Sequence, residues 1–374
     1  MTAATMSLLH DRLAAVLRGE PVAWASLEST PEHLLETIRD EGVLGLACQS
    51  LRRGGATDWP SEVLDAVAAE ARAAAATELA RGREVTRVLA ALAERRLLPI
   101  LLKGTALAYS RYRSPALRPR EDTDLLIRET EADAARQVMG ELGYRAPAYD
   151  EQLHGQVPLV RTDDLAVQHA FDFHWRLSTQ AAFAELLGYD EIASESVAVP
   201  ALGPAARAAC DVHALLLACV HPAMHHRNEE RLIWVHDVHL LAGRLREREL
   251  DRFAELAVAR GVARICAQEL GRACDRFGTV LPPGLLERLG AASGEATAVY
   301  LGRGRSWRDE LVSNVGALGS WRGRLGLLRR VAFPGPAYMM RSYDVEGAIG
   351  AVLLPLLYAH RAVRGVWRVL SGRK

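Results

Sequence analysis

Hydrophobic and polar positions divide the chain into a helical first quarter, a mixed middle and a helical remainder. Within residues 61–96, apolar side chains from Val67 to Leu92 recur mostly at every third or fourth position, so they share one face of a helix. Thr30-Pro31 adds a helix start, because Thr is a favoured N-cap and Pro fits the first helical position. We therefore expect residues 1–96 to be mainly helical.

The pattern changes after residue 96, where short apolar runs alternate with helical spacing. The expected elements are a strand over 98–102, a helix over 105–112, a polar loop over 113–121, a strand over 123–127, a helix over 129–142 and a strand over 165–175. This order implies an α/β or α+β core, and we favour α+β. The predicted fold is a small mixed-sheet core flanked by N-terminal and C-terminal helical regions.

Four regions follow from these changes in pattern. They are a helical N-terminal region (1–96), the α+β core (97–200), a His-rich helical region (201–300) and a basic C-terminal tail (301–374). Within the tail, residues 303–374 hold 13 basic and four acidic side chains, a formal charge of +9 against −9 for the rest. Such a tail could meet an anionic partner or surface. We expect it instead to pack on the acidic body.

Composition excludes several classes of protein. The 374 residues are 49% hydrophobic and 25% charged with a formal net charge of zero, as in ordinary globular proteins, and no specific nucleic-acid partner is predicted. Five widely spaced Cys without a Cys-x-x-Cys pair argue against a disulfide framework. No signal peptide is visible, and the longest apolar run, 347–359, is shorter than a membrane span. These features favour a cytoplasmic protein without a transmembrane segment.

A pair of carboxylates is the first sign of chemistry. Asp122 and Asp124 lie two apart on a predicted strand, so both point to one face while Leu125 and Ile127 point to the other. Two like charges on one strand face repel each other. A chain tolerates that repulsion more readily when a cation lies between them, and paired oxygen ligands suit Mg²⁺.

A glycine turn precedes this pair. Gly104 follows a strand and precedes a helix, so free backbone N–H groups at the helix start would form an anion site. Thr105 adds a hydroxyl, and Lys103 adds a positive charge in a chain with only one other lysine. A phosphate site beside two metal-binding carboxylates is what phosphoryl or nucleotidyl transfer requires. Arg118 and Arg120 could bind phosphate as well, or pair with Glu121 and other acids.

The third predicted strand adds another carboxylate. Alternation places Asp172 and His174 on its polar face, with Phe171 and Phe173 on the apolar one. Asp172 could bind a second metal ion or deprotonate an attacking hydroxyl. His174 could help to bind an acceptor or form a hydrogen bond in the core.

Together these motifs resemble the uncharacterised nucleotidyltransferase family of bacteria, which belongs to the polymerase-β-like nucleotidyltransferase superfamily. The resemblance implies that Gly104 and Thr105 hold a triphosphate, and that Asp122, Asp124 and Asp172 form a triad that binds two Mg²⁺ ions. An NMP would pass from an NTP to an acceptor, with release of pyrophosphate. Thr105 replaces the superfamily's Ser or Gly, and the 18 residues from Gly104 to Asp122 exceed the usual spacing. The acceptor could be a small molecule, a peptide or a protein, in one of varied biosynthetic settings.

A second cluster leaves two alternatives open. His221 and His225 share a helix face, and Asp237 follows His236, a dipeptide that weakly resembles a His/Asp metal phosphohydrolase. We expect these side chains instead to lie on the acceptor side of the site, with Asp237 paired to a histidine. The other alternative is a degenerate module that binds a nucleotide or a partner without turnover. The complete set of three carboxylates argues against it.

Overall fold

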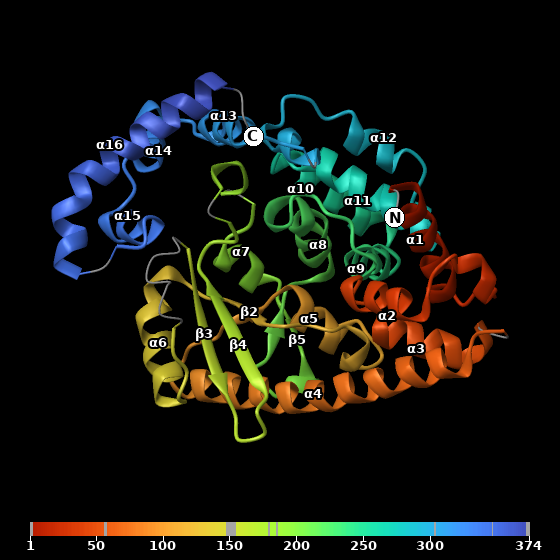
Figure 1. The fold of residues 1–374 in the computed structure, drawn as a ribbon. Coiled ribbons are helices and arrows are strands. Elements are labelled where there is room, and N and C mark those ends of the chain that lie inside the picture. The colour runs from red at the N-terminus through yellow and green to blue at the C-terminus, as the bar shows by residue number, and fades with distance from the viewer. Residues whose placement is uncertain are drawn as a thin grey trace.

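The computed structural model describes residues 3–55, 58–146, 155–178, 180–184, 186–302, 304–345 and 347–371. Its first region is helical, as expected. The helices are α1 (Ala3–Leu17), α2 (Pro31–Asp40), α3 (Leu44–Ser50) and α4 (Ser61–Glu94). The hydroxyl of Thr30 accepts a hydrogen bond from the backbone N–H of His33, which confirms the predicted N-cap of α2. The 34-residue helix α4 runs along one side of the sheet (Figure 1).

A mixed six-stranded sheet forms the middle of the molecule. Its elements are β1 (Ile100–Leu101), α5 (Lys103–Ser110), β2 (Thr123–Leu126), α6 (Ala132–Glu141), β3 (Gln156–Thr162), β4 (Gln168–His174), α7 (Tyr189–Ser194), β5 (Val197–Ala198) and β6 (Arg207–Ala208). The strand order is β3-β4-β2-β1-β6-β5. The pairs β2/β4 and β1/β6 are parallel, and the other three pairs are antiparallel. The predicted α+β fold is confirmed.

Helices of the third region cover the other face of the sheet. They are α8 (Asp211–His225), α9 (Leu232–Ala242), α10 (Glu247–Ala259), α11 (Ala263–Phe277) and α12 (Leu285–Gly290). Strand alternation divides the sheet between two cores. Leu125 of β2 packs with Val88 of α4 and Phe173 of β4, whereas Leu126 belongs to the core that contains Leu215 of α8. The face that carries Leu126 is therefore the one turned toward α8.

The predicted strands correspond to β1, β2 and β4, with bounds one to three residues shorter at most of their ends. Strands β3, β5 and β6 were not predicted from the sequence. The helix expected from Thr105 begins instead at Lys103, whose φ of 48° is left-handed. The helix expected from Glu129 begins at Ala132, after one 3₁₀ turn.

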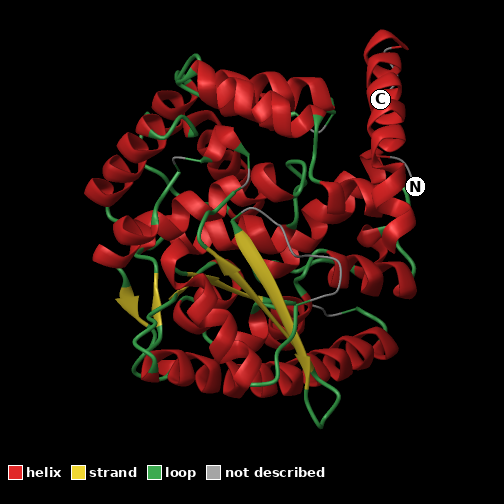
Figure 2. Ribbon diagram, turned by 90° about the vertical axis from the view of Figure 1, so that its left-hand side faces the viewer, coloured by secondary structure: helices red, strands yellow, loops and turns green. Residues whose placement is uncertain are grey.

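The C-terminal region consists of α13 (Trp307–Ala317), α14 (Trp321–Ala332), α15 (Pro336–Ser342) and α16 (Gly347–Ser371). Helix α13 packs on the body, because Ser313 donates to the carbonyl of Ala296 and Asn314 donates to the hydroxyl of Tyr300. Helices α14 to α16 form an arc at the upper left of Figure 1, and the end of α16 projects upward in Figure 2. In the part of the chain that the structure describes, no helix is both long and apolar enough to cross a membrane.

Candidate active site

The register of two parallel strands sets two carboxylates side by side. Asp124 on β2 is the Cα partner of Asp172 on β4. Asp122 lies one residue before β2, so strand alternation directs its side chain to the same face as Asp124 and Leu126. That face is turned toward α8. The three carboxylates predicted from the sequence therefore lie on one face of the sheet, beside the cavity described below.

Among the three carboxylates, Asp122 has a pKa raised by its surroundings. Burial, together with the negative charges of Asp124 and Asp172, raises the pKa of the Asp122 carboxyl to about 6. Ionisation of Asp122 is therefore harder in the free protein than in water, and further positive charge close by would make it easier. A cation bound among the three carboxylates would remove this penalty.

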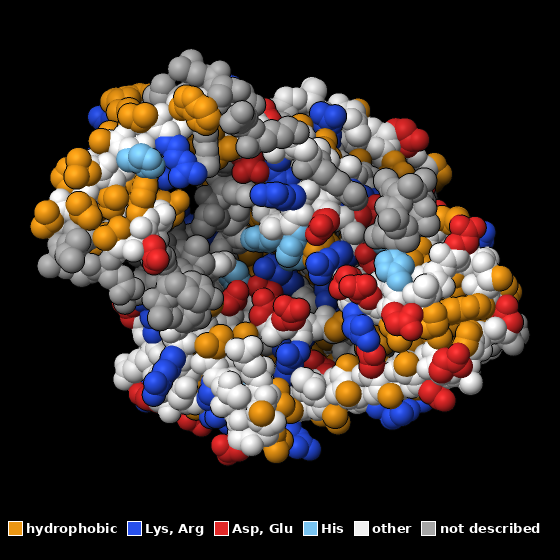
Figure 3. All heavy atoms as spheres, viewed as in Figure 1, with side chains coloured by type: hydrophobic (Ala, Val, Ile, Leu, Met, Phe, Trp, Pro, Cys, Tyr) orange, Lys and Arg blue, Asp and Glu red, His pale blue; other side chains and the backbone are white. Residues whose placement is uncertain are grey.

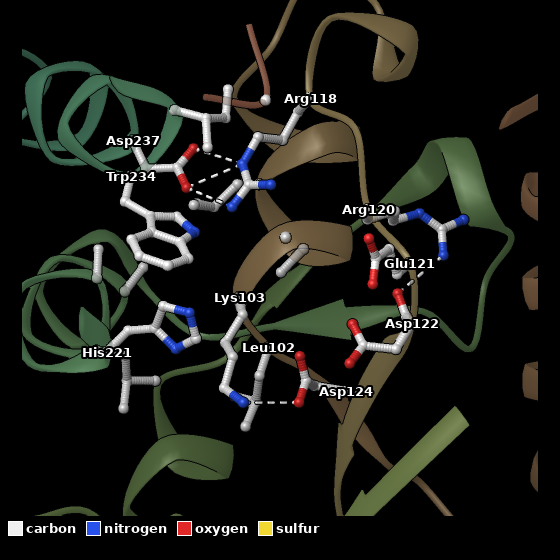
Figure 4. A pocket seen from close by; sticks show the side chains of 18 of the residues that line it. Leu102, Lys103, Arg118, Arg120, Glu121, Asp122, Asp124, His221, Trp234 and Asp237 are labelled. Atoms are coloured by element: carbon white, nitrogen blue, oxygen red, sulfur yellow. Dashed lines mark hydrogen bonds and ion pairs between the residues drawn. The ribbon is translucent and has the colours of Figure 1, made fainter. Parts of the chain in front are cut away.

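Lys103 supplies one such positive charge. Its Nζ lies 2.7 Å from Oδ1 of Asp124 (Figure 4). Nε2 of His174 lies 2.7 Å from the same oxygen. Burial alone would raise the pKa of Asp124, but Lys103 and His174 hold it well below its ordinary value. Burial likewise opposes the charge of Lys103, yet its pKa is raised by Asp124, Asp122 and Asp172. A cation already lies where the carboxylates gather.

The same side chains could hold a metal ion. Asp124, Asp172 and His174 each offer a ligand atom, and these atoms all lie within 4.8 Å of one another. Asp122 lies outside that close group. Carboxylate oxygens are the donors that Mg²⁺ prefers, whereas imidazole is not. His174 therefore fits better as the partner that orients Asp124 than as a ligand of Mg²⁺.

The first turn of α5, which contains Lys103 and Gly104 rather than following them as expected, lies next to the carboxylates. Lys103 and Gly104 line the cavity, and the left-handed backbone of Lys103 is uncommon for a residue that carries a side chain. A Cβ at Gly104 would approach Arg118 at 3.5 Å, an ordinary contact, so packing alone does not require glycine. The buried hydroxyl of Thr105 donates to the backbone carbonyl of Asp122 at 3.3 Å. Thr105 therefore ties α5 to the start of β2.

Arg118 joins the polar loop to helix α9. Its Nε and Nη2 donate to both carboxylate oxygens of Asp237 at 2.7–3.0 Å (Figure 4). The hydroxyl of Tyr112 donates to Asp237 at 2.7 Å. Both charged side chains are buried and line the cavity. Asp237, which the sequence suggested for the acceptor side and for pairing with a histidine, is thus paired with an arginine.

Arg120 points away from Lys103 in the close view (Figure 4). Its Nη2 donates to Oε1 of Glu78 on α4 at 3.0 Å, and its Nη1 donates to the hydroxyl of Thr123 at 2.7 Å and to the backbone carbonyl of Asp122 at 3.2 Å. These contacts fix the start of β2. The carboxylate that pairs with Arg120 is Glu78, not the adjacent Glu121 considered from the sequence.

A wall of aromatic rings faces the carboxylates across the cavity (Figure 4). His221 and His225, four residues apart on α8, have ring centroids 5.5 Å apart, and Trp234 of α9 lies 5.3 Å from His221. Burial, together with the charge of Lys103, lowers the pKa of His221 well below its ordinary value and that of His225 to about 3. Both imidazoles are therefore neutral at pH 7.

These groups surround a cavity of about 440 Å³, a size typical of small-molecule sites. In the space-filling view, acidic, basic and histidine side chains gather around the hollow in the centre of this face (Figure 3). The lining also includes Arg39 of α2, Arg231 and Trp234, which the sequence did not indicate as site residues. Arg39 has no motif beside it in the chain, and the His236-Asp237 dipeptide that follows Arg231 and Trp234 did not point to a role for these two residues.

The His236-Asp237 pair does not form a metal centre of its own. Nδ1 of His236 lies 3.0 Å from the hydroxyl of Tyr112, and its ring packs against Phe277. Among the residues described, no third potential ligand joins His236 and Asp237 within 4.8 Å. The geometry therefore offers no support for a His/Asp phosphohydrolase.

A glycine in the first helical turn after one strand, an Asp-x-Asp pair at the start of the next strand and a third Asp on a parallel neighbour define an enzyme of the nucleotidyltransferase class. A family model described as "Uncharacterised nucleotidyltransferase" matches residues 28–278, and the chain belongs to this family. The predicted family and enzyme class are thereby confirmed. No curated protein matches the chain. The matched segment contains every cavity residue discussed above, whereas α12 to α16 lie beyond it.

Proposed function

We propose that this nucleotidyltransferase is Mg²⁺-dependent and transfers an NMP from an NTP to an acceptor, with release of pyrophosphate. The observation that carries the proposal is the register pairing of Asp124 with Asp172, beside Asp122 on the same face of the sheet. Two Mg²⁺ ions held there would neutralise the triphosphate and stabilise both the attacking and the leaving oxygens. The cation at Lys103 supports this assignment, because the carboxylates already attract positive charge.

On the donor side, Lys103 and Gly104 would contact the triphosphate, since both line the cavity next to Asp124. Arg118 lies beside Gly104 and would add positive charge to the same end of the cavity. Thr105 and Arg120 both bind the backbone carbonyl of Asp122. We assign these two a positioning role rather than direct contact with phosphate.

On the acceptor side, the neutral rings of His221 and His225 would form the opposite wall of the cavity, with His174 at its floor. Neutral imidazoles can donate or accept hydrogen bonds without adding charge. The acceptor's nucleophilic atom would attack the α-phosphorus, the bond between the α-phosphorus and the bridging oxygen would break, and pyrophosphate would leave. Asp172 would take the acceptor's proton. Asp237 would act through Arg118.

Isothermal titration of each of the four NTPs, with and without MgCl₂, tests the proposal. We expect one or more NTPs to bind wild type only when Mg²⁺ is present. Asp122→Ala/Asp124→Ala should lose this binding, since two of the three proposed ligands are gone. Asp133→Asn is the matched control, because Asp133 is an almost fully exposed carboxylate on α6.

Two outcomes would contradict the proposal. Mg²⁺-dependent NTP binding that persists in the double variant would show that Asp122 and Asp124 are not the metal ligands. The absence of NTP binding to folded wild type would show that an NTP is not the donor substrate. NTP binding without pyrophosphate release, over a panel of small-molecule and peptide acceptors, would instead favour a binding module without turnover.

A further inference from the structure

Two helices of the C-terminal region present apolar stripes to solvent. On α14, Trp321, Leu325 and Leu328 follow one another at spacings of four and three; on α16, Val352, Leu356, Val363 and Trp367 follow at four, seven and four. Such spacings place each set on one helix face. All seven side chains are between 42% and 78% exposed. Soluble proteins rarely expose contiguous apolar patches of this kind without a binding role.

Arginines accompany both stripes. Arg322, Arg324 and Arg329 are exposed on α14, and Arg364 is exposed on α16. The guanidinium of Arg322 lies over the ring of Trp321. Residues 303–374 carry a formal charge of +9. The helices thus combine Trp and Leu on one face with Arg beside it, the composition of helices that lie in a membrane interface.

The occupant of these stripes has to be both apolar and anionic. The C-terminal region of a second copy would offer apolar side chains but would carry the same charge of +9, so the two regions would repel each other. Residues 1–302 are acidic, but their exposed large hydrophobic side chains, among those described, come from separate segments of the chain: Leu79, Leu98, Leu165, Val258 and Val280. An anionic lipid bilayer satisfies both conditions, with charge at its surface and hydrocarbon beneath.

We propose that α14 and α16 bind the chain peripherally to an anionic lipid surface. The two helices would lie in the interface with their apolar stripes among the acyl chains and their arginines at the headgroups. In Figure 3 the hydrophobic side chains of the arc gather at the upper left, apart from the polar hollow in the centre. The catalytic cavity therefore takes no part in this contact. The proposal does not depend on the proposed function.

The test is co-sedimentation of the full chain with vesicles. Vesicles of phosphatidylcholine alone are compared with vesicles containing equal parts of phosphatidylcholine and phosphatidylglycerol. We expect partition onto the anionic vesicles to be stronger by about tenfold or more, since several basic side chains near the surface would each add attraction to the anionic headgroups. Raising NaCl from about 0.1 M to about 0.5 M should weaken it, because salt screens the attraction.

A negative charge introduced into each stripe gives the decisive comparison. Leu325→Glu/Val363→Glu should lower partition onto the anionic vesicles by about tenfold or more, because both stripes then carry a charge that the hydrocarbon excludes. Val280→Glu, at an exposed apolar position of the body, is the matched control and should bind like wild type. Unchanged melting temperatures would confirm that all variants are folded.

Three results would overturn the proposal. The first is no partition of wild type onto anionic vesicles. The second is equal partition of wild type and Leu325→Glu/Val363→Glu. The third is a wild-type dimer, detected by light scattering, that the double variant abolishes, because it would assign the stripes to a second copy.

Discussion

Lys103 and Asp124, 21 residues apart in the chain, form a 2.7 Å ion pair at the point where the site's carboxylates gather. The lysine occupies a position of strong negative potential, to which Asp122 and Asp172 also contribute. A metal ion bound to Asp124 would compete with this ammonium group for the same oxygen. Removing the lysine should therefore show how strongly its ammonium group competes with a metal ion for Asp124.

Lys103→Met should make the free protein less stable by about 2 kcal/mol, because the carboxylates lose a buried counter-charge while His174 still binds Asp124. Added Mg²⁺ should then raise the melting temperature of the variant more than that of wild type, since no ammonium competes for Asp124. Thermal unfolding with and without MgCl₂ measures both effects. Arg136→Met on the exposed side of α6 serves as the control. An equal response to Mg²⁺ in variant and wild type would refute the competition.

Asp122 predicts a dependence of stability on pH. Its folded pKa of about 6 lies above the ordinary value of 3.8, so the folded state binds the proton more tightly than the unfolded state. The stability linked to this proton is complete below pH 3.8 and is lost as the pH rises through about 6, a change of about 3 kcal/mol.

Asp122→Asn should therefore be more stable than wild type by about 1–3 kcal/mol at pH 8 without metal, and should show little difference at pH 4. Urea unfolding at both pH values provides the measurement. Asp133→Asn should show no such pH-dependent difference, because Asp133 is solvated. If Asp122→Asn were destabilising at pH 8, the assigned direction of the pKa shift would be wrong.

The buried pair of Arg118 and Asp237 predicts a non-additive effect on stability. Asp237→Leu should lower the free energy of unfolding by about 3–5 kcal/mol, because the guanidinium stays buried without its counter-ion. Arg118→Met/Asp237→Leu should recover a large part of that loss, since neither charge remains. Denaturant unfolding of the two single variants and the double variant completes the cycle. Additive losses would show that the two side chains are not coupled.

Gly104→Ala separates binding from folding. The added methyl group would make only ordinary contacts with Arg118 and Arg120, so the melting temperature should change little. The methyl group would nevertheless occupy the turn where we place the triphosphate, and KM for the NTP should rise about tenfold or more. Initial rates of pyrophosphate release give KM, and a thermal melt supplies the folding control. An unchanged KM would show that the triphosphate does not lie against Gly104.

The candidate site residues could largely be located from the sequence because their signals are local. The Asp122-x-Asp124 alternation and the run that ends at Gly104 each depend on fewer than ten neighbouring residues, and both lie next to the cavity, with Gly104 inside the first turn of α5 rather than before it. Asp172 was predicted on the polar face of its strand. Its pairing with Asp124 was not, because parallel register over 48 residues leaves no periodic trace in the sequence.

Long-range partners account for most of what the sequence did not reveal. Asp237 lies 119 residues from Arg118, and Glu78 lies 42 residues from Arg120, so nothing adjacent to either arginine identifies its partner. The tail shows the same limit. Its charge suggested docking on the acidic body, and α13 does pack there, yet the stripes on α14 and α16 face solvent.

Helix α4 has a consequence for how this enzyme could be divided or recombined. Glu78 holds Arg120 at the start of β2, Glu84 accepts a 2.6 Å hydrogen bond from Tyr144, and Val88 shares a core with the sheet. The change in sequence pattern near residue 97 is therefore no boundary for genetic exchange. A fragment that began there would lack α4, the helix that covers one face of its sheet. The shortest segment that keeps the sheet together with α4 therefore begins at or before Ser61.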